Sequence, residues 1–382
     1  MTVWDTLVGQ TPVVTTLQAA VAGRGMTQTW LFTGPPGSGR SNAALAFAAA
    51  LQCPSGGCGE CQDCHLSLVG SHPDVTVVRT DKLSLGVDEV RELVRRSALA
   101  PVGGGRQVLV IEDADRLTEQ AANALLKAIE EPTEHTVWLL CAPTVEDILP
   151  TIRSRCRFVG LATPTTADVT SYLVRVDGVS EALASYAARA SQGHIGRARA
   201  LARDEATRNR RRDVVAYPVR LTSLGACLNA ASNFHEVTQE EAQAITDDLD
   251  ARDKVDLDAA YGVVERGRRP REYAPALAAM QKAHKTRAKR RHLDVIDRGL
   301  MDLASVYRDA ISLSMGVPGG LINEELRGEI AELSRASSPE GHLRRIDAIF
   351  AAREQMLEFN VPPLLALESM MLALRVPRRS VG

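Results

Sequence analysis

The sequence predicts an α/β domain built on a parallel sheet, followed by an all-helical remainder. Up to about residue 161, short apolar runs alternate with segments of helical periodicity, which is the pattern of a parallel sheet with helical connections. Beyond Thr163-Pro164 the strand-like runs almost disappear, and alanine, leucine and arginine dominate. The expected strands are Trp30–Phe32, Val75–Val78, Val108–Ile111, Val137–Cys141 and Phe158–Leu161.

A glycine-rich loop separates the first expected strand from the helical run 43–51. It reads GPPGSGRS over residues 34–41 and matches the phosphate-binding pattern G-x-x-x-x-G-K-[ST], except that arginine replaces the lysine. Glycines let backbone N–H groups curl around phosphate oxygens, the helix N-terminus adds positive dipole, and the hydroxyl holds Mg²⁺. Arginine keeps the charge, but its planar fork is larger than an ammonium. The candidate nucleotide-binding residues in this loop are Gly34, Gly37, Gly39, Arg40 and Ser41.

Two carboxylates follow the third expected strand. Glu112 and Asp113 come directly after Val108–Ile111, at the carboxyl end of a parallel strand, where α/β sheets bind ligands. The usual order in active enzymes is Asp for the metal and then Glu to orient water, whereas here Glu comes first. We therefore expect these acids to complete a degenerate nucleotide site, with solvated loop acids as the alternative.

Four of the seven cysteines lie close together in the sequence. Cys53, Cys58, Cys61 and Cys64 give the spacing C-x₄-C-x₂-C-x₂-C, whose overlapping C-x-x-C pairs let thiolates converge on one tetrahedral ion. Four thiolates leave no open position for water, so we expect a structural zinc ion. Free thiols, a redox pair and an iron–sulfur cluster are the alternatives.

The chain has 382 residues, 45% hydrophobic content and a formal net charge of -2. This length predicts two or three domains, and this charge argues against a globally basic coat for nucleic acid. No charged and apolar leader opens the sequence, and no apolar run is long enough for a membrane helix. We therefore expect a cytoplasmic protein without a membrane span.

Two basic tracts lie in the helical remainder. They consist of Arg208, Arg210, Arg211 and Arg212 in the first tract, and of Lys282, Lys285, Arg287, Lys289, Arg290 and Arg291 in the second. Such tracts can neutralise DNA phosphates. A solvated helix face is the other interpretation, and the near absence of aromatic residues among them does not support base stacking.

Several motifs occur together in one order. The phosphate-binding loop is followed by the cysteine cluster, by LLKAIEEP over residues 125–132, and by Ser154-Arg155-Cys156. With these motifs the chain resembles the delta prime family of subunits of the bacterial replicative clamp loader, part of the DNA polymerase III holoenzyme. The match covers residues 1 to about 200 through specific motifs and the rest through a similar helical character.

The resemblance implies an AAA+ architecture. It implies a P-loop α/β domain with the cysteine module over residues 1–161, a small helical lid domain over 162–207, and a helical collar domain over 208–382 that joins a hetero-oligomer. Arg155 matches the arginine finger that reaches ATP held by the neighbouring motor subunit. The lid motif G-S-x-R-x-A of active loader ATPases reads GHIGRA over residues 193–198, so its arginine falls on Gly196. Arg197 is one position late, which turns its side chain by about 100° on a helix.

The expected function is that of a largely non-hydrolysing stator that donates Arg155 to a neighbouring ATPase subunit and helps to load the sliding clamp onto primed DNA. The implied partners are the gamma/tau and delta subunits, the sliding clamp, and primer-template DNA through the assembled complex at the replisome. Zinc is the expected cofactor, while binding of ATP and Mg²⁺ by this subunit is left open. The chain would thus be a component of a nucleotidyltransferase complex. The alternatives are an ATP-hydrolysing motor of the gamma/tau type and an independent P-loop kinase.

Overall fold

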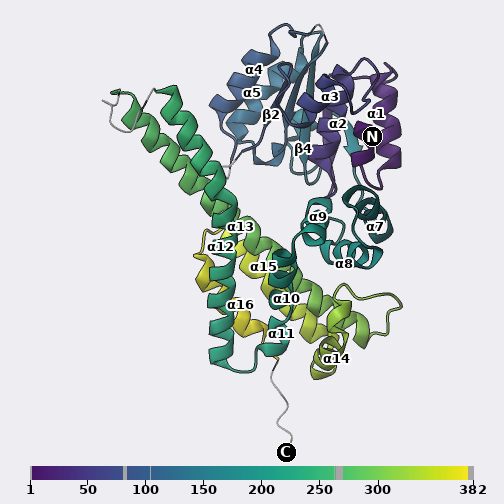
Figure 1. Cartoon of the computed structure of the whole chain (residues 1–382), viewed down its shortest axis with the longest axis vertical. Helices are drawn as coiled ribbons and strands as arrows, with labels where there is room; N and C mark the ends of the chain where they lie inside the picture. Colours follow the sequence, from purple (N-terminus) through teal and green to yellow (C-terminus); the bar gives the residue numbers. More distant parts are fainter. Residues whose placement is uncertain (1, 81–83, 104, 262, 264–269, 377–382) are drawn as a thin grey trace, which may run out of the picture. The chain divides into compact units, whose positions relative to one another are not determined.

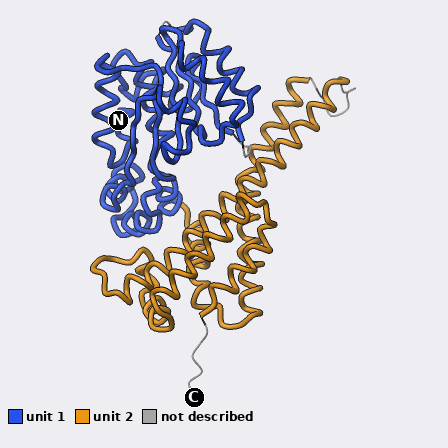
Figure 2. Tube along the Cα trace, turned by 180° about the vertical axis from the view of Figure 1, so that it is seen from behind, with its two compact units in different colours: residues 1–203 blue, residues 204–382 orange. Residues whose placement is uncertain are grey.

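The computed structural model describes residues 2–80, 84–103, 105–261, 263 and 270–376. The chain divides into two compact units, residues 1–203 and residues 204–382 (Figure 2). Each unit has hydrophobic clusters of its own. Within the described ranges, no helix is long and apolar enough to cross a membrane.

Unit 1 is built on a five-stranded parallel sheet with the strand order β2-β3-β4-β1-β5. All five predicted strands are present, as β1 (Thr29–Thr33), β2 (Val75–Val78), β3 (Gln107–Ile111), β4 (Thr136–Ala142) and β5 (Arg157–Gly160). Because β1 and β3 both pair with β4 in parallel, the loops that follow them leave the sheet at the same edge. These two loops carry the predicted phosphate loop and the predicted acids.

Helices cover both faces of this sheet (Figure 1). On one face lie α1 (Thr11–Val21), α2 (Arg40–Gln52) and α3 (Gln62–Leu68), and on the other α4 (Val87–Ser97), α5 (Glu119–Glu130) and α6 (Pro150–Arg153). Two short 3-10 turns, η1 (Val3–Thr6) and η2 (Ala114–Arg116), complete this part. Strand residues alternate between the faces, since Trp30 and Phe32 pack in the α2 cluster and Leu31 packs in the α4 and α5 cluster.

Residues 166–203 form a small helical cluster inside unit 1. Here α7 (Thr166–Tyr172) runs into a π-helical turn (Leu173–Asp177), and α8 (Glu181–Ser191) and α9 (Ile195–Arg203) follow. Their buried residues, mostly alanine and leucine, form a separate hydrophobic cluster. The predicted division into three domains is finer than the two units and stays a prediction, and its second limit falls inside α10 (Glu205–Val215).

Unit 2 is all-helical in its described part, as predicted. After α10 come α11 (Tyr217–Arg220), α12 (Leu224–Ala260), α13 (Tyr273–Ser314), the 3-10 turn η4 (Glu324–Leu326), α14 (Arg327–Ala336), α15 (Pro339–Leu357) and α16 (Pro363–Leu374). An apolar stripe at helical spacing along α13 is buried in the core at Leu293, Ile296, Leu300, Leu303 and Tyr307. The long helices α12 and α13 lie side by side, and their distal halves extend beyond the other helices of the unit as an arm (Figure 1).

Arg211 of the first basic tract is a core residue, so both interpretations of the tract, DNA contact and solvated face, are wrong for it. Its side chain is 2% exposed. Nε donates to Asp302 Oδ1 at 3.1 Å, Nη1 to Glu325 Oε1 at 3.1 Å, and Nη2 to Asn323 Oδ1 at 2.5 Å. The sequence prediction failed at Arg211 because its neighbours in the sequence are charged, whereas its own side of α10 packs against α13.

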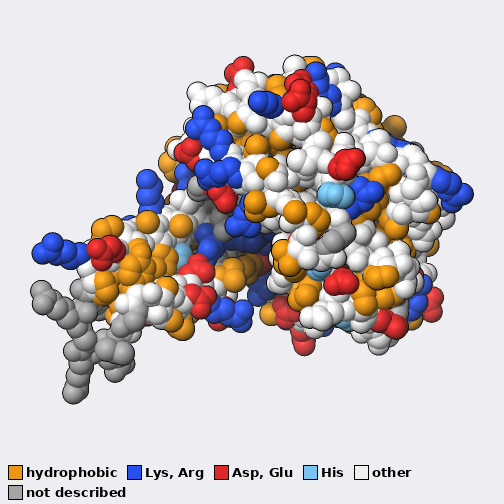
Figure 3. Space-filling view, turned by 90° about the horizontal axis from the view of Figure 1, so that it is seen from above, with side chains coloured by type: hydrophobic (Ala, Val, Ile, Leu, Met, Phe, Trp, Pro, Cys, Tyr) orange, Lys and Arg blue, Asp and Glu red, His pale blue; other side chains and the backbone are white. Residues whose placement is uncertain are grey.

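The second basic tract pairs in part with α12 inside the arm. Arg287 Nη1 lies 2.7 Å from Asp250 Oδ1 and 2.8 Å from Asp253 Oδ2, and His284 Nε2 lies 3.1 Å from the same Asp253 oxygen. On the face shown in Figure 3, basic and acidic side chains are interspersed. Ion pairs with α12 therefore neutralise part of the positive charge of the second basic tract.

Candidate functional site

The predicted phosphate loop lies between the end of β1 and the first turn of α2. Gly34, Gly37 and Gly39 have φ angles of 154°, 84° and 92°, a backbone region that favours glycine. At Gly34 there is also no room for a side chain, because a Cβ would lie 2.6 Å from the carbonyl oxygen of Leu161. The loop leads into α2, whose first-turn N–H groups have no partner within the helix and therefore suit an anion.

Arg40, at the position of the usual lysine, turns back onto its own loop. Its Nη1 donates to the carbonyl oxygen of Gly34 at 2.5 Å. Ser41, the candidate Mg²⁺ ligand, is half-buried in the first turn of α2. Ser38 Oγ is buried and finds no hydrogen-bond partner among the described atoms. In this arrangement the arginine closes the loop instead of extending toward an incoming phosphate.

The acids after β3 lie at the same edge of the sheet as the phosphate loop, and each has an arginine side chain beside it. Glu112 Oε2 lies 2.8 Å from Nε of Arg79, which directly follows β2, while Glu112 Oε1 is buried without a partner in the described part of the chain. Asp113 Oδ1 is 3.9 Å from Arg116 Nε. Burial raises the pKa of Asp115, and the charge of Asp113 acts in the same direction. Arg79 is a contact that sequence reasoning missed, since it comes from a different strand.

His194 packs against the phosphate loop from the helical cluster. A Cβ on Gly37 would lie 2.4 Å from His194 Cγ, which shows how closely the imidazole approaches the loop. Its Nδ1 accepts the backbone N–H of Arg197 at 3.2 Å, so the first turn of α9 orients the ring. Gly196, at the predicted position of the lid arginine, is exposed and offers no side chain. Nothing in the sequence marks His194, because the contact joins two segments far apart in the chain.

Arg155 lies in the turn between α6 and β5. Its side chain is 40% exposed. Nη1 donates to the carbonyl oxygen of Thr151 at 2.7 Å and to Ser154 Oγ at 3.0 Å, and Nη2 lies 2.7 Å from Glu130 Oε1. The guanidinium therefore sits at the surface of unit 1, where another chain can reach it.

The four cysteines predicted to bind zinc converge between α2 and α3. One Sγ from each lies within 4.8 Å of all the others. Cys53 Sγ is 3.7 Å from the Sγ atoms of both Cys58 and Cys61. Zinc–sulfur bonds of about 2.3 Å in a tetrahedron separate the sulfurs by about 3.8 Å, so the cluster has the size of one zinc site.

Backbone N–H groups favour a thiolate in this cluster. The N–H of Cys58 donates to Cys53 Sγ at 3.4 Å, and the N–H of Gly59 donates to Cys64 Sγ at 3.4 Å. Burial opposes ionisation of Cys53, but hydrogen bonds from the backbone outweigh it and lower the pKa of Cys53 to about 6. Burial and the neighbouring thiolates raise the pKa of Cys64. A divalent cation removes this repulsion between thiolates, so the donor set fits zinc.

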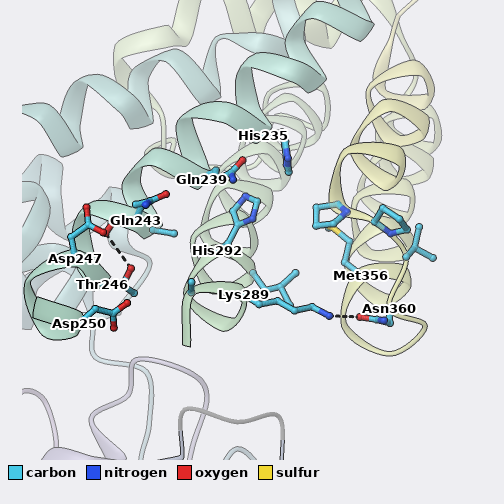
Figure 4. A pocket seen from close by; sticks show the side chains of 16 residues that line it. His235, Gln239, Gln243, Thr246, Asp247, Asp250, Lys289, His292, Met356 and Asn360 are labelled. Atoms are coloured by element: carbon cyan, nitrogen blue, oxygen red, sulfur yellow. Dashed lines mark hydrogen bonds between the residues drawn. The ribbon is translucent and has the colours of Figure 1, made fainter. Parts of the chain in front are cut away.

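A cavity of about 520 Å³ opens in unit 2, where α12, α13 and the turn between α15 and α16 meet (Figure 4). On one side the ring centroids of His235 and His292 are 4.9 Å apart, and on the other Lys289 Nζ donates to Asn360 Oδ1 at 2.6 Å. Burial lowers the pKa of His292, and charge on His235 lowers it further. The described lining contains Lys289 of the second basic tract and none of the predicted nucleotide, finger or metal residues.

Two family descriptions match the chain. Residues 9–165 match the family described as DNA polymerase III, delta subunit, and residues 294–375 match the one described as DNA polymerase III, delta subunit, C terminal. The first covers the sheet and its helices, and the second covers most of the core of unit 2. Together they account for the two parts of the chain that the motifs and the helical character indicate.

Proteins similar to the α/β part include two kinds of DNA polymerase III subunit. The delta prime subunit of Pseudomonas aeruginosa is 39% identical over 162 residues, which is 40% of this chain and 49% of that protein. The delta prime subunit of Escherichia coli is 38% identical over 186 residues, 47% of this chain and 55% of that protein. The gamma/tau subunit of Mycobacterium tuberculosis is 38% identical over 155 residues, 39% of this chain and 27% of that protein. The chain thus spans about half the length of the delta prime relatives it matches.

A solved structure of a gamma subunit-related protein from Thermotoga maritima is 16% identical, with a TM-score of 0.44 over 96% of this chain and 99% of that one. The predicted α/β domain on a parallel sheet and the predicted all-helical remainder are both confirmed by the strand order and the helices described above. The chain belongs to the DNA polymerase III delta-subunit family, whose two descriptions match both of its units, and delta prime subunits are among the relatives that the succession of motifs indicates.

Proposed function

We propose that this chain is a clamp-loader subunit of DNA polymerase III that hydrolyses little or no ATP itself and donates Arg155 to ATP bound by a neighbouring subunit. The observation that carries the proposal is the state of the phosphate loop. Arg40 is bound to Gly34, and His194 lies against Gly37, so two of the chain's own side chains contact the backbone of the loop. From the family we infer the partners: gamma/tau and delta subunits, the sliding clamp and primed DNA.

Three parts of a hydrolytic site are altered in this chain. The lysine of the phosphate loop is Arg40, the acid Glu112 is held by Arg79, and Gly196 offers no lid arginine. Hydrolysis of ATP depends on positioned charge around the γ-phosphate more than on covalent chemistry. The changes at these three positions support a subunit that does not hydrolyse ATP, while backbone amides leave binding of ATP and Mg²⁺ open.

Arg155 supports the donor role by its exposure and its chemistry. A guanidinium from outside the nucleotide site neutralises charge that develops on the γ-phosphate, and it does so only when the subunits are correctly docked. An arginine finger must therefore project from a surface that meets a neighbour. The turn after α6 supplies such a surface, and the cysteine module and the collar helices of unit 2 have structural roles in the same proposal.

The test is steady-state ATPase of the reconstituted loader with clamp and primed DNA. Arg155→Ala should preserve folding, metal content and assembly but slow turnover, since fingers supplied in trans contribute about 10³ to 10⁵ in rate in GTPases and one interface of several is affected here. Arg155→Lys should not restore the rate, because an ammonium lacks the bidentate fork. Arg153→Ala, at the end of α6, is the control. Unchanged turnover in a correctly assembled Arg155→Ala loader would contradict the donor role.

A gamma/tau-type motor is the competing function, because gamma/tau subunits match the α/β part with nearly the same identity as delta prime subunits. ATP turnover by the isolated chain separates the two functions. The proposed stator should show negligible turnover alone. Robust turnover by the single chain, abolished by Ser41→Ala, would establish the motor instead.

A further inference from the structure

Glu130 connects two sequence motifs that lie apart in the chain. It is the acid that follows Ile129 in the LLKAIEEP motif and the last residue of α5, and its Oε1 lies 2.7 Å from Nη2 of Arg155 in the Ser-Arg-Cys turn. Both side chains are partly exposed, 40% for Arg155 and 44% for Glu130. The function proposed above gives Arg155 a role but leaves Glu130 without one.

The place of Glu130 is set by a rigid element. Leu125 and Ile129 are buried in the core beneath α5, so the end of the helix cannot drift away from the sheet. The C-terminus of a helix carries negative partial charge, which adds to the carboxylate in attracting a guanidinium. Arg155 is thereby drawn to its own subunit from a defined direction.

The contacts of Arg155 use both of its terminal amino groups. Nη1 donates to the Thr151 carbonyl oxygen and to Ser154 Oγ, and Nη2 faces Glu130. Bidentate binding of a phosphate requires two parallel N–H donors of the fork. Because Nη2 takes part in bidentate binding and is held by Glu130, a γ-phosphate competes with the carboxylate for this amino group.

We propose that Glu130 is a positioning residue that holds Arg155 withdrawn on its own subunit until the γ-phosphate of a neighbour's ATP replaces its carboxylate. The proposal rests on the donor role proposed for Arg155. The exchange is feasible because an exposed ion pair is weak, whereas a phosphate offers the guanidinium more charge and more acceptor oxygens. Glu130 thus raises the ATP concentration at which the finger engages and leaves the rate of the engaged complex unchanged.

The test compares the ATP dependence of turnover in reconstituted loaders carrying Glu130→Gln, Glu131→Gln, Arg155→Ala or the pair Glu130→Gln/Arg155→Ala. Glu130→Gln should lower the ATP concentration for half-maximal turnover by about 1.5- to 5-fold, the range of an exposed ion pair, with the maximal rate unchanged. Glu131→Gln, in the adjacent and exposed residue, should behave as the parent loader. The double variant should match Arg155→Ala, because Glu130 acts through Arg155.

Each contrary result has one meaning. In the first, Arg155→Ala slows turnover while Glu130→Gln and Glu131→Gln need the same ATP concentration for half-maximal turnover. In that case the role of Glu130 is overturned and the donor role of Arg155 stands. A shift by Glu130→Gln that persists in the Arg155→Ala background, or a drop in the maximal rate, also overturns it. If Arg155→Ala has no effect, the donor role and the role of Glu130 fall together.

Discussion

Arg211 and Arg212 are neighbours in one basic tract and have different surroundings. Arg211 is buried and binds Asp302, Glu325 and Asn323, whereas Arg212 is exposed and its Nη2 donates to Asn209 Oδ1 at 2.6 Å within its own helix. A buried charge that loses its partner is costly, while an exposed hydrogen bond of this kind contributes little. Substitutions at these two residues therefore compare the loss of a buried arginine with the loss of an exposed one.

We expect Arg211→Ala to lower the free energy of unfolding of unit 2 by about 3–5 kcal/mol, because it leaves the buried Asp302 carboxylate without its cation. Arg212→Ala should change this free energy by less than about 0.5 kcal/mol. Calorimetric unfolding of the full chain measures both. Equal stabilities for the two variants would show that the buried network of Arg211 does not hold in solution.

At the scale of one element, the cysteine module closes the connection between α2 and α3. Cys53 ends α2, while Cys61 accepts the backbone N–H of Cys64 and so caps α3. The 3-10 turn η1 packs beside the module, with the N–H of Val3 donating to the carbonyl oxygen of Gly57 at 3.2 Å. A metal held there would join the end of α2, the loop after it and α3.

We predict one tightly bound zinc ion per chain, and Cys61→Ser should lose it and loosen the module while the sheet stays folded. Metal content by mass spectrometry of protein purified under reducing conditions, together with circular dichroism, measures both effects. Cys156→Ser, outside the cluster, should keep the metal. A metal-free parent protein, or full zinc content in Cys61→Ser, would contradict the assignment.

At the scale of the whole molecule, buried histidines make the free energy of unfolding depend on pH. His342 has no exposed surface, and both ring nitrogens are without a hydrogen-bond partner in the described part of the chain. Burial lowers its pKa below the ordinary 6.5, and the charge of Arg345 lowers it further. The folded state therefore favours the neutral ring, so the unfolded chain binds more protons below about pH 6.5.

Stability from His342 should be fully present above about pH 6.5 and should decrease as the pH falls from there toward the lowered pKa of the folded state. Urea unfolding of the full chain at pH 7.5 and at pH 5.5 measures the loss. His342→Leu should reduce the difference between the two pH values, whatever its effect on stability at pH 7.5. A pH dependence identical in the parent and His342→Leu would remove His342 as its source.

The correct predictions from the sequence rest on patterns formed by residues that are close together in the chain. Apolar runs separated by helical segments predicted all five strands, since a buried parallel strand is apolar on both faces. The short spacing of Cys53 to Cys64 predicted that their sulfurs lie close together, because few arrangements of so short a segment keep them apart. The buried face of α13 is a local pattern of the same kind, because its apolar residues recur at helical spacing.

By itself, the sequence determined the fold class, the family and the types of residue at the candidate nucleotide, finger and metal positions, because each is recorded in a motif or a period. Only the tertiary structure decided that His194 lies on the phosphate loop, that Glu130 holds Arg155, and that Arg211 is a core ion pair. Each of these contacts joins elements that are not neighbours in the sequence. Their partners depend on how the elements pack, and packing at these positions leaves no periodic mark on the chain.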